Sequence, residues 1–470
     1  MEYNILLNHR AVSRYYLQHD NYIVVIQVLQ IQYSDNNGIL LKSQKNNLDN
    51  FTACEGCDLL LPAVEAPPGH SVVCPRCGTT ISRRSTHSIA KTLALSITGL
   101  FLYFPAVLLP LMTLESFGFK ESANIIESIV IFYTNDYYFV AFMVLFSALI
   151  LPLVLLSLIF TLSLNLRFKR YPLYLARLFR TYLKLEEWAM VEVYLLGIMI
   201  TIIKMMGHSE IHYHVGMLCF SLLVLVSLAI TTVIDKDFFW ETIERGGKGK
   251  HQPQMKFPGA DEEPFVTAAE RGIQLCHTCH KLSLSSATTC PRCGDGLHSR
   301  KPQSVSRTWA LVMTSIVFFI PANIMPIMQV DFLGVPDRST ILDGIIYFFH
   351  TGSYAIGLII FTASILVPLF KIVGLTILLL STHPKSTRYL RQKTAMFRFI
   401  SFIGRWSMLD IFVIALLTVL VDFGFFSSIH AAPAATYFCF VVAATMCAAI
   451  TFDPRIMWDK YTHYTKTAHD

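Results

Sequence analysis

The segments Phe104-Pro-Ala-Val-Leu-Leu-Pro110 and Ile320-Pro-Ala-Asn-Ile-Met-Pro326 are two versions of one motif, and this duplication decides the fold. Their first prolines are 321 − 105 = 216 residues apart. Because a sequence that repeats over a long period builds one structural unit more than once, we predict two modules of the same fold. Further residues recur at this offset or at 406 − 188 = 218 residues: Pro152 with Pro368, Trp188 with Trp406, and Trp240 with Trp458.

The composition favours a membrane protein over a soluble enzyme or a disordered scaffold. Of 470 residues, 53% are hydrophobic and 15% are charged, whereas soluble domains carry roughly 25% charged residues. Apolar surface on this scale needs lipid to cover it. The net charge of +6 is too small to indicate nucleic-acid binding, so we predict no nucleic-acid partner.

Eight apolar segments are long enough to cross a bilayer as helices, which takes about 20 residues. Six are uncharged, and two are interrupted only by Glu192 and Asp410. Four segments fall in each module, so we predict an all-α polytopic membrane protein whose two modules have parallel topology. The predicted spans are Thr92–Leu114, Tyr137–Leu166, Trp188–Ile203, Ile211–Ile234, Thr308–Val330, Gly344–Phe370, Trp406–Val421 and Phe423–Phe452.

Lysine and arginine predict the orientation of these spans. They concentrate before the first and fifth spans, between the second and third, and between the sixth and seventh. The segments Glu115–Asp136 and Val330–Asp343 carry more acidic than basic residues. By the positive-inside rule, the basic loops, the central linker and both termini lie in the cytoplasm and the acidic segments lie outside. No signal peptide is visible at the N-terminus.

The repeat divides the chain into seven parts. Residues 1–50 form an N-terminal extension with no counterpart in the repeat. Either a disordered tail or a misplaced translation start accounts for it, and we assign it no function. The other parts are a zinc ribbon at 51–82, a four-helix module at 83–245, a cytoplasmic linker at 246–272, a second zinc ribbon at 273–298, a second four-helix module at 299–460 and a cytoplasmic tail at 461–470.

Each predicted ribbon holds two Cys-x2-Cys pairs, separated by 16 residues in the first and 10 in the second. Four thiolates can surround a tetrahedral zinc ion, and a reducing cytoplasm favours metal over disulfides. We therefore predict two structural zinc ions, with catalysis or thiol redox exchange as alternatives. His277 and His280 flank the second set and are weaker candidates as ligands. The predicted ligands are Cys54, Cys57, Cys74, Cys77, Cys276, Cys279, Cys290 and Cys293.

Charged residues inside the predicted spans are the second candidate site, because an ionised side chain at the membrane centre costs roughly 2.5 to 3.5 kcal/mol. Lys371 and Asp410 lie in the sixth and seventh spans, with the hydroxyls of Ser364, Ser407 and Thr445 nearby along the helices. Two interpretations remain open: a coupling site such as a protonation switch, or an ion pair that only joins two helices. In the first module Leu155 replaces Lys371, and Glu192 matches Asp410.

Five motifs together resemble the paraquat-inducible protein A family, over about residues 51 to 461. The resemblance implies an inner-membrane protein of Gram-negative bacteria that works with a periplasmic MCE-domain partner in phospholipid transport. It also implies the eight cysteine ligands, and a polar interior at Ser364, Lys371, Ser407, Asp410 and Thr445. The motifs are the two Cys-Pro-Arg-Cys pairs, Ile320–Pro326, Ser364–Pro368, Gly404–Asp410, and Phe452–Arg455 followed by Trp458.

We therefore predict a non-enzymatic, multi-pass component that moves phospholipid or a similar amphiphile between the inner and outer membranes. No G-x-x-x-x-G-K-[ST] nucleotide-binding motif occurs in the chain. Energy would then come from the proton gradient, from a partner or from the lipid gradient. The alternatives are a thiol- or zinc-based redox-responsive membrane protein and a secondary transporter of a small solute.

Overall fold

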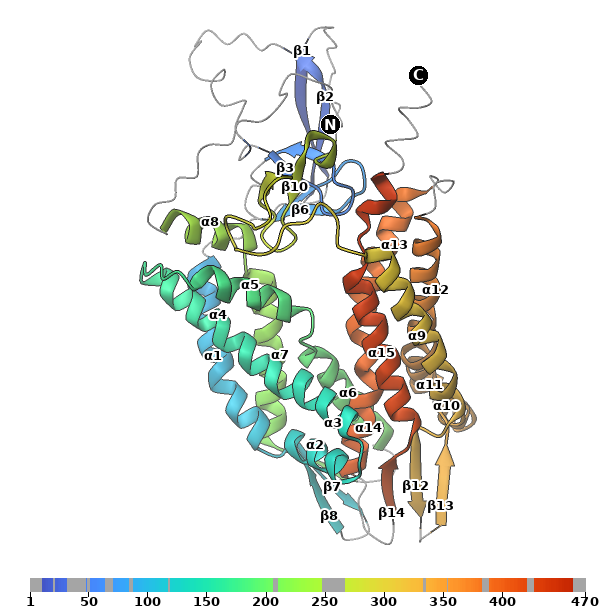
Figure 1. The fold of residues 1–470 in the computed structure, drawn as a ribbon. Coiled ribbons are helices and arrows are strands. Elements are labelled where there is room, and N and C mark those ends of the chain that lie inside the picture. The colour runs from blue at the N-terminus through green and yellow to red at the C-terminus, as the bar shows by residue number, and fades with distance from the viewer. Residues whose placement is uncertain are drawn as a thin grey trace.

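The computed structural model describes residues 11–19, 22–31, 48, 51–63, 71–83, 88–116, 119–205, 210–246, 267–332, 335–352, 354–382, 389–420 and 427–459. Figure 1 shows two helical bodies side by side, with small β-structures that contain the cysteines at one end and strands at the other. We call residues 88–246 module 1 and residues 299–459 module 2. Residues 51–83 are ribbon 1 and residues 267–298 are ribbon 2.

The elements of the two modules follow the same order. Module 1 consists of α1 (Ser88–Leu108), β7 (Met112–Ser116), β8 (Phe119–Ala123), α2 (Ile125–Thr134), α3 (Tyr138–Val144), η2 (Leu145–Ile150), α4 (Leu151–Arg167), α5 (Leu175–Glu186), α6 (Val191–Met205), β9 (Glu210–Tyr213), α7 (Val215–Val233) and α8 (Lys236–Gly246). Module 2 consists of α9 (Ser304–Ile324), β12 (Met328–Phe332), β13 (Val335–Ser339), α10 (Ile341–His350), α11 (Tyr354–Phe361), η4 (Thr362–Leu366), α12 (Val367–Leu380), α13 (Leu390–Ile403), η5 (Gly404–Met408), α14 (Leu409–Leu420), β14 (Ser427–Ala431) and α15 (Ala434–Thr451).

The predicted duplication extends to single hydrogen bonds. At the start of module 1, the Ser88 hydroxyl donates to the Val233 carbonyl at 2.8 Å and accepts from the Asp235 amide at 3.0 Å. In module 2, the Ser304 hydroxyl makes the matching bonds to Thr451 and Asp453, both at 2.9 Å. Each serine thereby ties the first helix of its module, α1 or α9, to the end of α7 or α15.

A π-helical segment precedes the repeated proline in both modules. Residues 145–150 form η2 before Pro152, and residues 362–366 form η4 before Pro368. Proline lacks an amide proton and clashes with the carbonyl four residues earlier, which here belongs to the π segment. The wider turn of a π-helix relieves that clash. The break is therefore a consequence of the repeated proline and is part of the duplicated plan.

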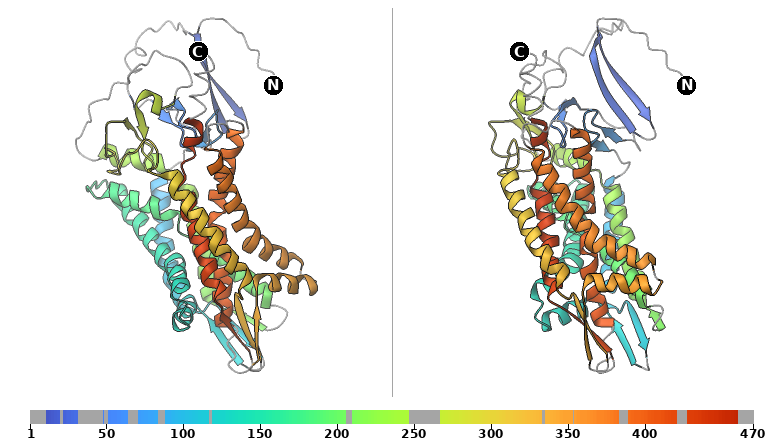
Figure 2. Two further views of the ribbon diagram at one scale, coloured as in Figure 1. Left: turned by 45° about the vertical axis from the view of Figure 1, so that its right-hand side comes forward. Right: turned by 90° about the vertical axis from the view of Figure 1, so that its right-hand side faces the viewer.

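The ends opposite the ribbons carry one three-stranded antiparallel sheet per module, with the orders β8-β7-β9 and β13-β12-β14 (Figure 2). Met112 and Leu114 are buried while Thr113 and Glu115 between and after them are more exposed, which is the alternation of a half-buried strand. Pro110 stands two residues after the end of α1, where a helix cannot continue.

These sheets correct the predicted spans. Thr92–Leu114 and Thr308–Val330 run past the helix ends at Leu108 and Ile324 into strands, and Ile211–Ile234 begins in strand β9. The predicted span Phe423–Phe452 contains strand β14, and its first four residues lie outside the described part of the chain. The predicted span Gly344–Phe370 instead begins in α10 and continues through α11 and η4 into α12. In each case the predicted span was too long because apolar residues buried in a strand or a short helix have the same composition as a membrane-spanning helix.

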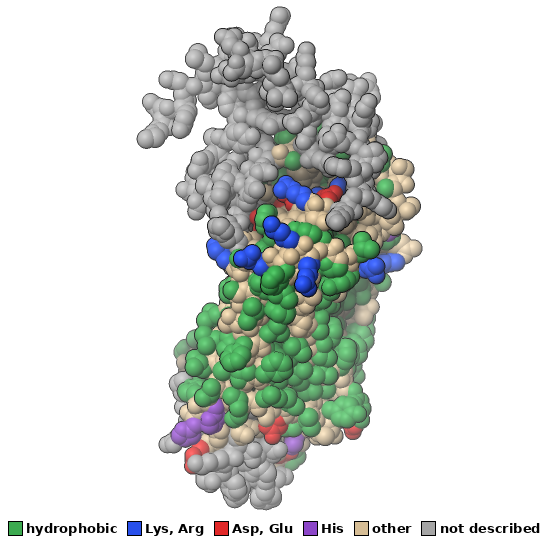
Figure 3. All heavy atoms as spheres, turned by 90° about the vertical axis from the view of Figure 1, so that its left-hand side faces the viewer, with side chains coloured by type: hydrophobic (Ala, Val, Ile, Leu, Met, Phe, Trp, Pro, Cys, Tyr) green, Lys and Arg blue, Asp and Glu red, His purple; other side chains and the backbone are tan. Residues whose placement is uncertain are grey.

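Seven helices among the described residues are long and apolar enough to cross a membrane: Ser88–Leu108, Tyr138–Arg167, Val215–Val233, Ser304–Ile324, Gly357–Leu380, Leu390–Leu420 and Ala434–Thr451. The predicted span Trp188–Ile203 corresponds to α6, whose 15 residues are about 22 Å long, short of the roughly 30 Å of a hydrocarbon core. Eight crossings therefore remain a prediction. On the face that Figure 3 shows, hydrophobic side chains form a broad belt over the helices.

The modules meet through α6 and α14. The rings of Tyr194 and Phe412 pack edge to face with centroids 5.1 Å apart, and these residues are equivalents at 412 − 194 = 218. Gly197 lies against Phe412, so a Cβ at position 197 would stand 3.1 Å from the Phe412 Cβ. Contact between equivalent residues is expected where two parallel modules are related by an approximate two-fold axis.

Candidate metal centres and intramembrane polar site

Both cysteine tetrads are buried and each converges on one point. The four Sγ atoms of each set lie within 4.8 Å of one another. Cys54 and Cys77 are 3.4 Å apart, and Cys276 and Cys293 are 3.5 Å apart. Tetrahedral coordination at about 2.3 Å would separate the sulfurs by about 3.8 Å, so either set fits a four-thiolate metal.

The backbone around the cysteines repeats one turn four times. After each Cys-x2-Cys pair, the next residue has a left-handed backbone, with φ of 61° at Asp58, 74° at Gly78, 54° at His280 and 69° at Gly294. The amide of that residue donates to the backbone carbonyl of the first cysteine of the pair, as the Gly78 amide does to the Cys74 carbonyl at 2.8 Å. The sequence signals this turn only where glycine occupies it. Four matched turns hold each pair of thiols on one side of the chain.

His277 and His280 are not part of the converging set. The His277 Nε2 lies 3.1 Å from the Arg455 guanidinium, and the His280 Nε2 lies 2.6 Å from a carboxylate oxygen of Glu55. Both imidazoles therefore make contacts between parts of the chain that are distant in sequence, which explains their presence beside the thiols.

The ribbons are exchanged between the modules. Ribbon 1, which precedes module 1, docks on module 2: its four cysteines pack in one cluster with Leu375, Leu378 and Trp458. Ribbon 2, which precedes module 2, docks on module 1, where its cysteines join the cluster of Phe179 and Trp240. The crossing was not predicted, because a sequence repeat does not say which copy contacts which.

Equivalent arginines secure the crossed contacts. Arg398 of α13 donates to the carbonyls of Gly78 and Cys77 in ribbon 1. Arg180 of α5, its equivalent at 398 − 180 = 218, donates to the Cys293 carbonyl in ribbon 2 at 3.4 Å. Each arginine thus contacts the second cysteine pair of the ribbon that belongs to the other module.

A buried charge network joins ribbon 1 to the end of module 2. The Arg455 guanidinium lies 2.8 Å from the Asp453 carboxylate and 3.8 Å from that of Asp58, and all three side chains are 2% exposed. Arg300 lies 2.8 Å from Asp58 as well. Burial alone would raise the pKa of Asp453, but hydrogen bonds and the charge of Arg455 outweigh burial and hold this pKa below its usual value.

Lys371 is fully buried in α12, and its ammonium donates to the Ser407 hydroxyl at 3.2 Å. Ser407 lies in the 3-10 segment η5, which separates α13 from α14, so it is not in the same α-helix as Asp410. Ser364 lies in the π-helical segment η4 and donates to the Ile360 carbonyl at 2.7 Å. Thus two of the predicted polar residues, Lys371 and Ser407, meet directly, and Ser407 lies where the helix departs from α geometry.

The remaining predicted residues are less closely joined. Thr445 is buried in α15 and donates to the Val442 carbonyl at 3.0 Å. Asp410 is the second residue of α14, and its side chain lies outside the described part of the structure. The predicted contact between Asp410 and Lys371 stays a prediction.

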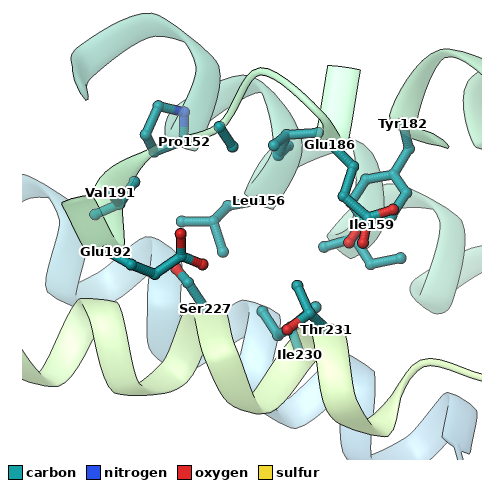
Figure 4. A pocket seen from close by; sticks show the side chains of 12 residues that line it. Pro152, Leu156, Ile159, Tyr182, Glu186, Val191, Glu192, Ser227, Ile230 and Thr231 are labelled. Carbon is teal, nitrogen blue, oxygen red and sulfur yellow. The ribbon is translucent and has the colours of Figure 1, made fainter. Parts of the chain in front are cut away.

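Glu192 lies in module 1 on the wall of a pocket that sequence reasoning missed. The pocket lies between α4, α5, α6 and α7 and is lined mainly by apolar side chains. Figure 4 shows the Glu192 carboxylate directed into it beside Ser227, and the Glu186 carboxylate toward the other end of the view. The 216 and 218 offsets could have located these residues, because they map the surroundings of Lys371 onto module 1.

Comparison with known proteins shows the family to which the chain belongs. The family model described as paraquat-inducible protein A matches residues 89–244 and 305–462, once for each module. The chain belongs to this family. The matched ranges follow the duplicated helical bodies and leave out both ribbons.

Named relatives cover nearly the whole chain. It is 32% identical to the intermembrane transport protein PqiA of Escherichia coli over 412 residues, 87% of this chain and 95% of the relative. It is 30% identical to the lipophilic envelope-spanning tunnel protein A of Escherichia coli over 88% of this chain and 92% of that protein. A probable intermembrane transport protein of Haemophilus influenzae is 27% identical over 87% and 95%. These names describe transport proteins rather than enzymes, and no solved structure matches the chain.

Proposed function

We propose that the chain is an inner-membrane component of a Gram-negative intermembrane transport system, which passes phospholipid or a similar amphiphile to a periplasmic MCE-domain partner. Its ribbons and termini are on the cytoplasmic side. The names of three relatives, which refer to intermembrane transport or to a tunnel spanning the envelope, support the transport role. The distribution of charge supports the orientation: in Figure 3, Lys and Arg side chains border the hydrophobic belt toward the ribbons, and His and acidic side chains border it toward the sheets.

The observation that carries the proposal is the position of Lys371. Its side chain is fully buried in a membrane-spanning helix, between a π-helical segment on its own helix and the 3-10 segment that holds Ser407. A buried cation at membrane depth is costly, and helix breaks of this kind are frequent at functional sites. We infer that Lys371, Ser407, Ser364, Thr445 and Asp410 form a site that couples proton movement to a change in the packing of module 2.

Variants of Lys371 test this role. Lys371→Met and Asp410→Asn should each abolish lipid transfer from donor vesicles through the reconstituted transport complex. Thr376→Val is a matched control, because Thr376 is also on α12 and its hydroxyl only donates to the Ile372 carbonyl at 2.7 Å. Thermal unfolding in detergent checks that all three variants fold. Transfer at the rate of the unmodified protein by both site variants would refute the coupling role.

We propose zinc in both cysteine sets, held by Cys54, Cys57, Cys74 and Cys77 in ribbon 1 and by Cys276, Cys279, Cys290 and Cys293 in ribbon 2. The close sulfur contacts run between the two pairs of each ribbon rather than within a pair, which suits a closed four-thiolate site better than a Cys-x2-Cys disulfide cycle. Metal analysis of purified protein should find about two zinc ions per chain. Metal-free protein whose mobility on gels changes with oxidant would favour the redox alternative.

A further inference from the structure

The loop between α4 and α5 carries a cluster of exposed cations. Arg167 is the last residue of α4, which ends a helix long and apolar enough to cross a membrane, so the loop lies at the level of the lipid headgroups. In Figure 1 the loop lies at the left of module 1, at the end of the helices nearest the ribbons. The exposed cations are Arg167, Lys169, Arg170 and Arg177.

These four cations are not neutralised within the described part of the chain. None of them forms an ion pair there, and the sequence between Asp136 and Glu186 contains no acidic residue. Tyr171 of the loop lies against the end of α8. The two carboxylates closest in sequence to that end already pair with other cations: Glu241 with Arg245, and Glu244 with Lys281 and Arg292.

The loop begins with a fixed turn. The amides of Lys169 and Arg170 donate to the carbonyls of Leu166 and Asn165, at 3.2 and 2.9 Å, and close the end of α4. Lys169 has a left-handed backbone with φ of 52°, a position that glycine adopts more easily than lysine. A side chain held at a costly backbone position is a reason to look for a function there.

Apolar side chains alternate with the cations along the loop. Phe168 is 67% exposed, Leu173 is 95% exposed and Tyr174 is 48% exposed. A soluble anion would cover the charges and leave these side chains in water. The interface of a bilayer covers both, because aromatic and apolar side chains enter it while Lys and Arg reach the phosphates.

We propose that the α4–α5 loop binds anionic phospholipid in the leaflet on the ribbon side, with Arg167, Lys169 and Arg170 on the headgroup phosphates and with Phe168 and Leu173 in the interface. Guanidinium groups suit phosphate oxygens because they offer two parallel donors. A lipid with net negative charge is favoured over phosphatidylcholine, whose own ammonium balances its phosphate.

The site goes beyond the proposed transport function and requires only that α4 spans the bilayer. It has a consequence for ribbon 2, because the loop leads directly into α5. There Arg180 donates to the Cys293 carbonyl at 3.4 Å, and Lys184 pairs with Asp295 at 2.9 Å. A lipid bound at the first turn of α5 therefore holds in place the helix on which ribbon 2 docks.

The experiment is native mass spectrometry of the full chain in detergent, titrated with phosphatidylglycerol and with phosphatidylcholine of identical acyl chains. We expect phosphatidylglycerol to bind about tenfold more tightly, because several cations next to anionic lipid act together. The double variant Lys169→Gln/Arg170→Gln should lose about tenfold in phosphatidylglycerol binding and leave phosphatidylcholine binding unchanged.

A matched control removes the same charge elsewhere on the same side of the membrane. Lys91→Gln/Arg307→Gln also replaces one lysine and one arginine, both exposed, near the ribbon-side ends of α1 and α9. This control should keep the preference for phosphatidylglycerol. Thermal unfolding in detergent checks that both double variants fold.

Two further measurements separate a lipid site from a site for a soluble phosphate. Phe168→Ser/Leu173→Ser keeps every charge and should weaken phosphatidylglycerol binding severalfold. Glycerol phosphate, which has a phosphate but no acyl chains, should not bind at the same concentrations.

Equal binding of the two lipids by the unmodified protein would overturn the proposal. So would equal losses in the loop variant and its control, because the effect would then belong to the charge of the whole surface. Glycerol phosphate that bound as tightly as the lipid would assign the loop to a soluble anion instead. None of these results bears on Lys371, whose role is measured by lipid transfer.

Discussion

In module 2 a lysine is fully buried and contacts a serine, whereas in module 1 a leucine takes the lysine position and lines a pocket beside Glu192. The frame around these two places is the same: each has a proline after a π-helical segment and a serine that ties the first helix to the last. The comparison teaches that the two modules share their backbone structure, whereas the side chains inside each module differ. Crossed ribbons keep the two specialised halves together.

The sharpest way to test the crossing is to disrupt one ribbon and ask which module responds. Cys77→Ser should prevent metal binding in ribbon 1 and expose module 2, although ribbon 1 precedes module 1 in the chain. Structural zinc contributes about 10 to 16 kcal/mol in isolated zinc-finger peptides, so the ribbon itself should unfold. We expect hydrogen exchange to rise mainly in α12 and α13, which pack against ribbon 1.

Cys293→Ser is the matched experiment. It disrupts ribbon 2, so exchange should rise mainly in α5 and α8, whose Arg180, Lys184 and Glu244 contact that ribbon. If each cysteine variant instead loosened the module that follows it in the chain, the crossed arrangement would be wrong.

The next largest effect should come from the buried network at the end of module 2. Asp453→Asn leaves the Arg455 guanidinium, 2% exposed, without its closest carboxylate. Breaking a buried ion pair typically costs about 3 to 5 kcal/mol. Asp235→Asn is the comparison in module 1, where the carboxylate accepts from the Phe238 amide at 3.0 Å as a helix cap. Because asparagine also caps helices well, this change should cost a few tenths of a kcal/mol.

Thermal unfolding in detergent measures both variants. A drop in midpoint of several degrees for Asp453→Asn and almost none for Asp235→Asn is expected. Equal drops in the midpoint would contradict this expectation. They would mean that Asp453, which pairs with Arg455, stabilises its module no more than Asp235 does.

A change of pH should have a smaller effect on the thermal unfolding midpoint. Because Arg455 holds the pKa of Asp453 below its usual value, ionised Asp453 stabilises the folded state above the unfolded-state pKa of about 3.9. This contribution is lost as the pH falls below that value and through the lower pKa of the folded state. The midpoint of the unmodified protein should therefore fall more steeply than that of Asp453→Asn below about pH 4. Parallel curves would show that the network does not depend on the Asp453 charge.

The sequence predicted the two modules and the cysteine sets, but it did not predict the strands or the contacts of the buried polar side chains. The duplicated prolines located both modules and the repeated Cys-x2-Cys pairs located both converging cysteine sets, because these residue types restrict the backbone or recur at the spacing of metal ligands. The strands after Leu108 and Ile324 were missed, since Met112 and Leu114 are apolar whether they are buried in a strand or lie in a span. Burial of Lys371 followed from its apolar neighbours, but its partner Ser407 depends on a break in the helix that the sequence does not reveal.

The smallest effect we expect comes from the arginines of the crossed contacts, and it asks whether the two docking surfaces are equal. Arg398→Gln removes donors to the carbonyls of Gly78 and Cys77, and Arg180→Gln removes a longer bond of 3.4 Å to the Cys293 carbonyl. Hydrogen bonds from charged groups contribute about 1.5 to 3 kcal/mol when buried and less when partly exposed, so each loss should be near 1 kcal/mol. Arg398 makes two such bonds to its ribbon, so its loss should increase hydrogen exchange in ribbon 1 more than the loss of Arg180 does in ribbon 2. The reverse order would indicate that Lys184, which pairs with Asp295 at 2.9 Å, is not enough to hold ribbon 2 without Arg180.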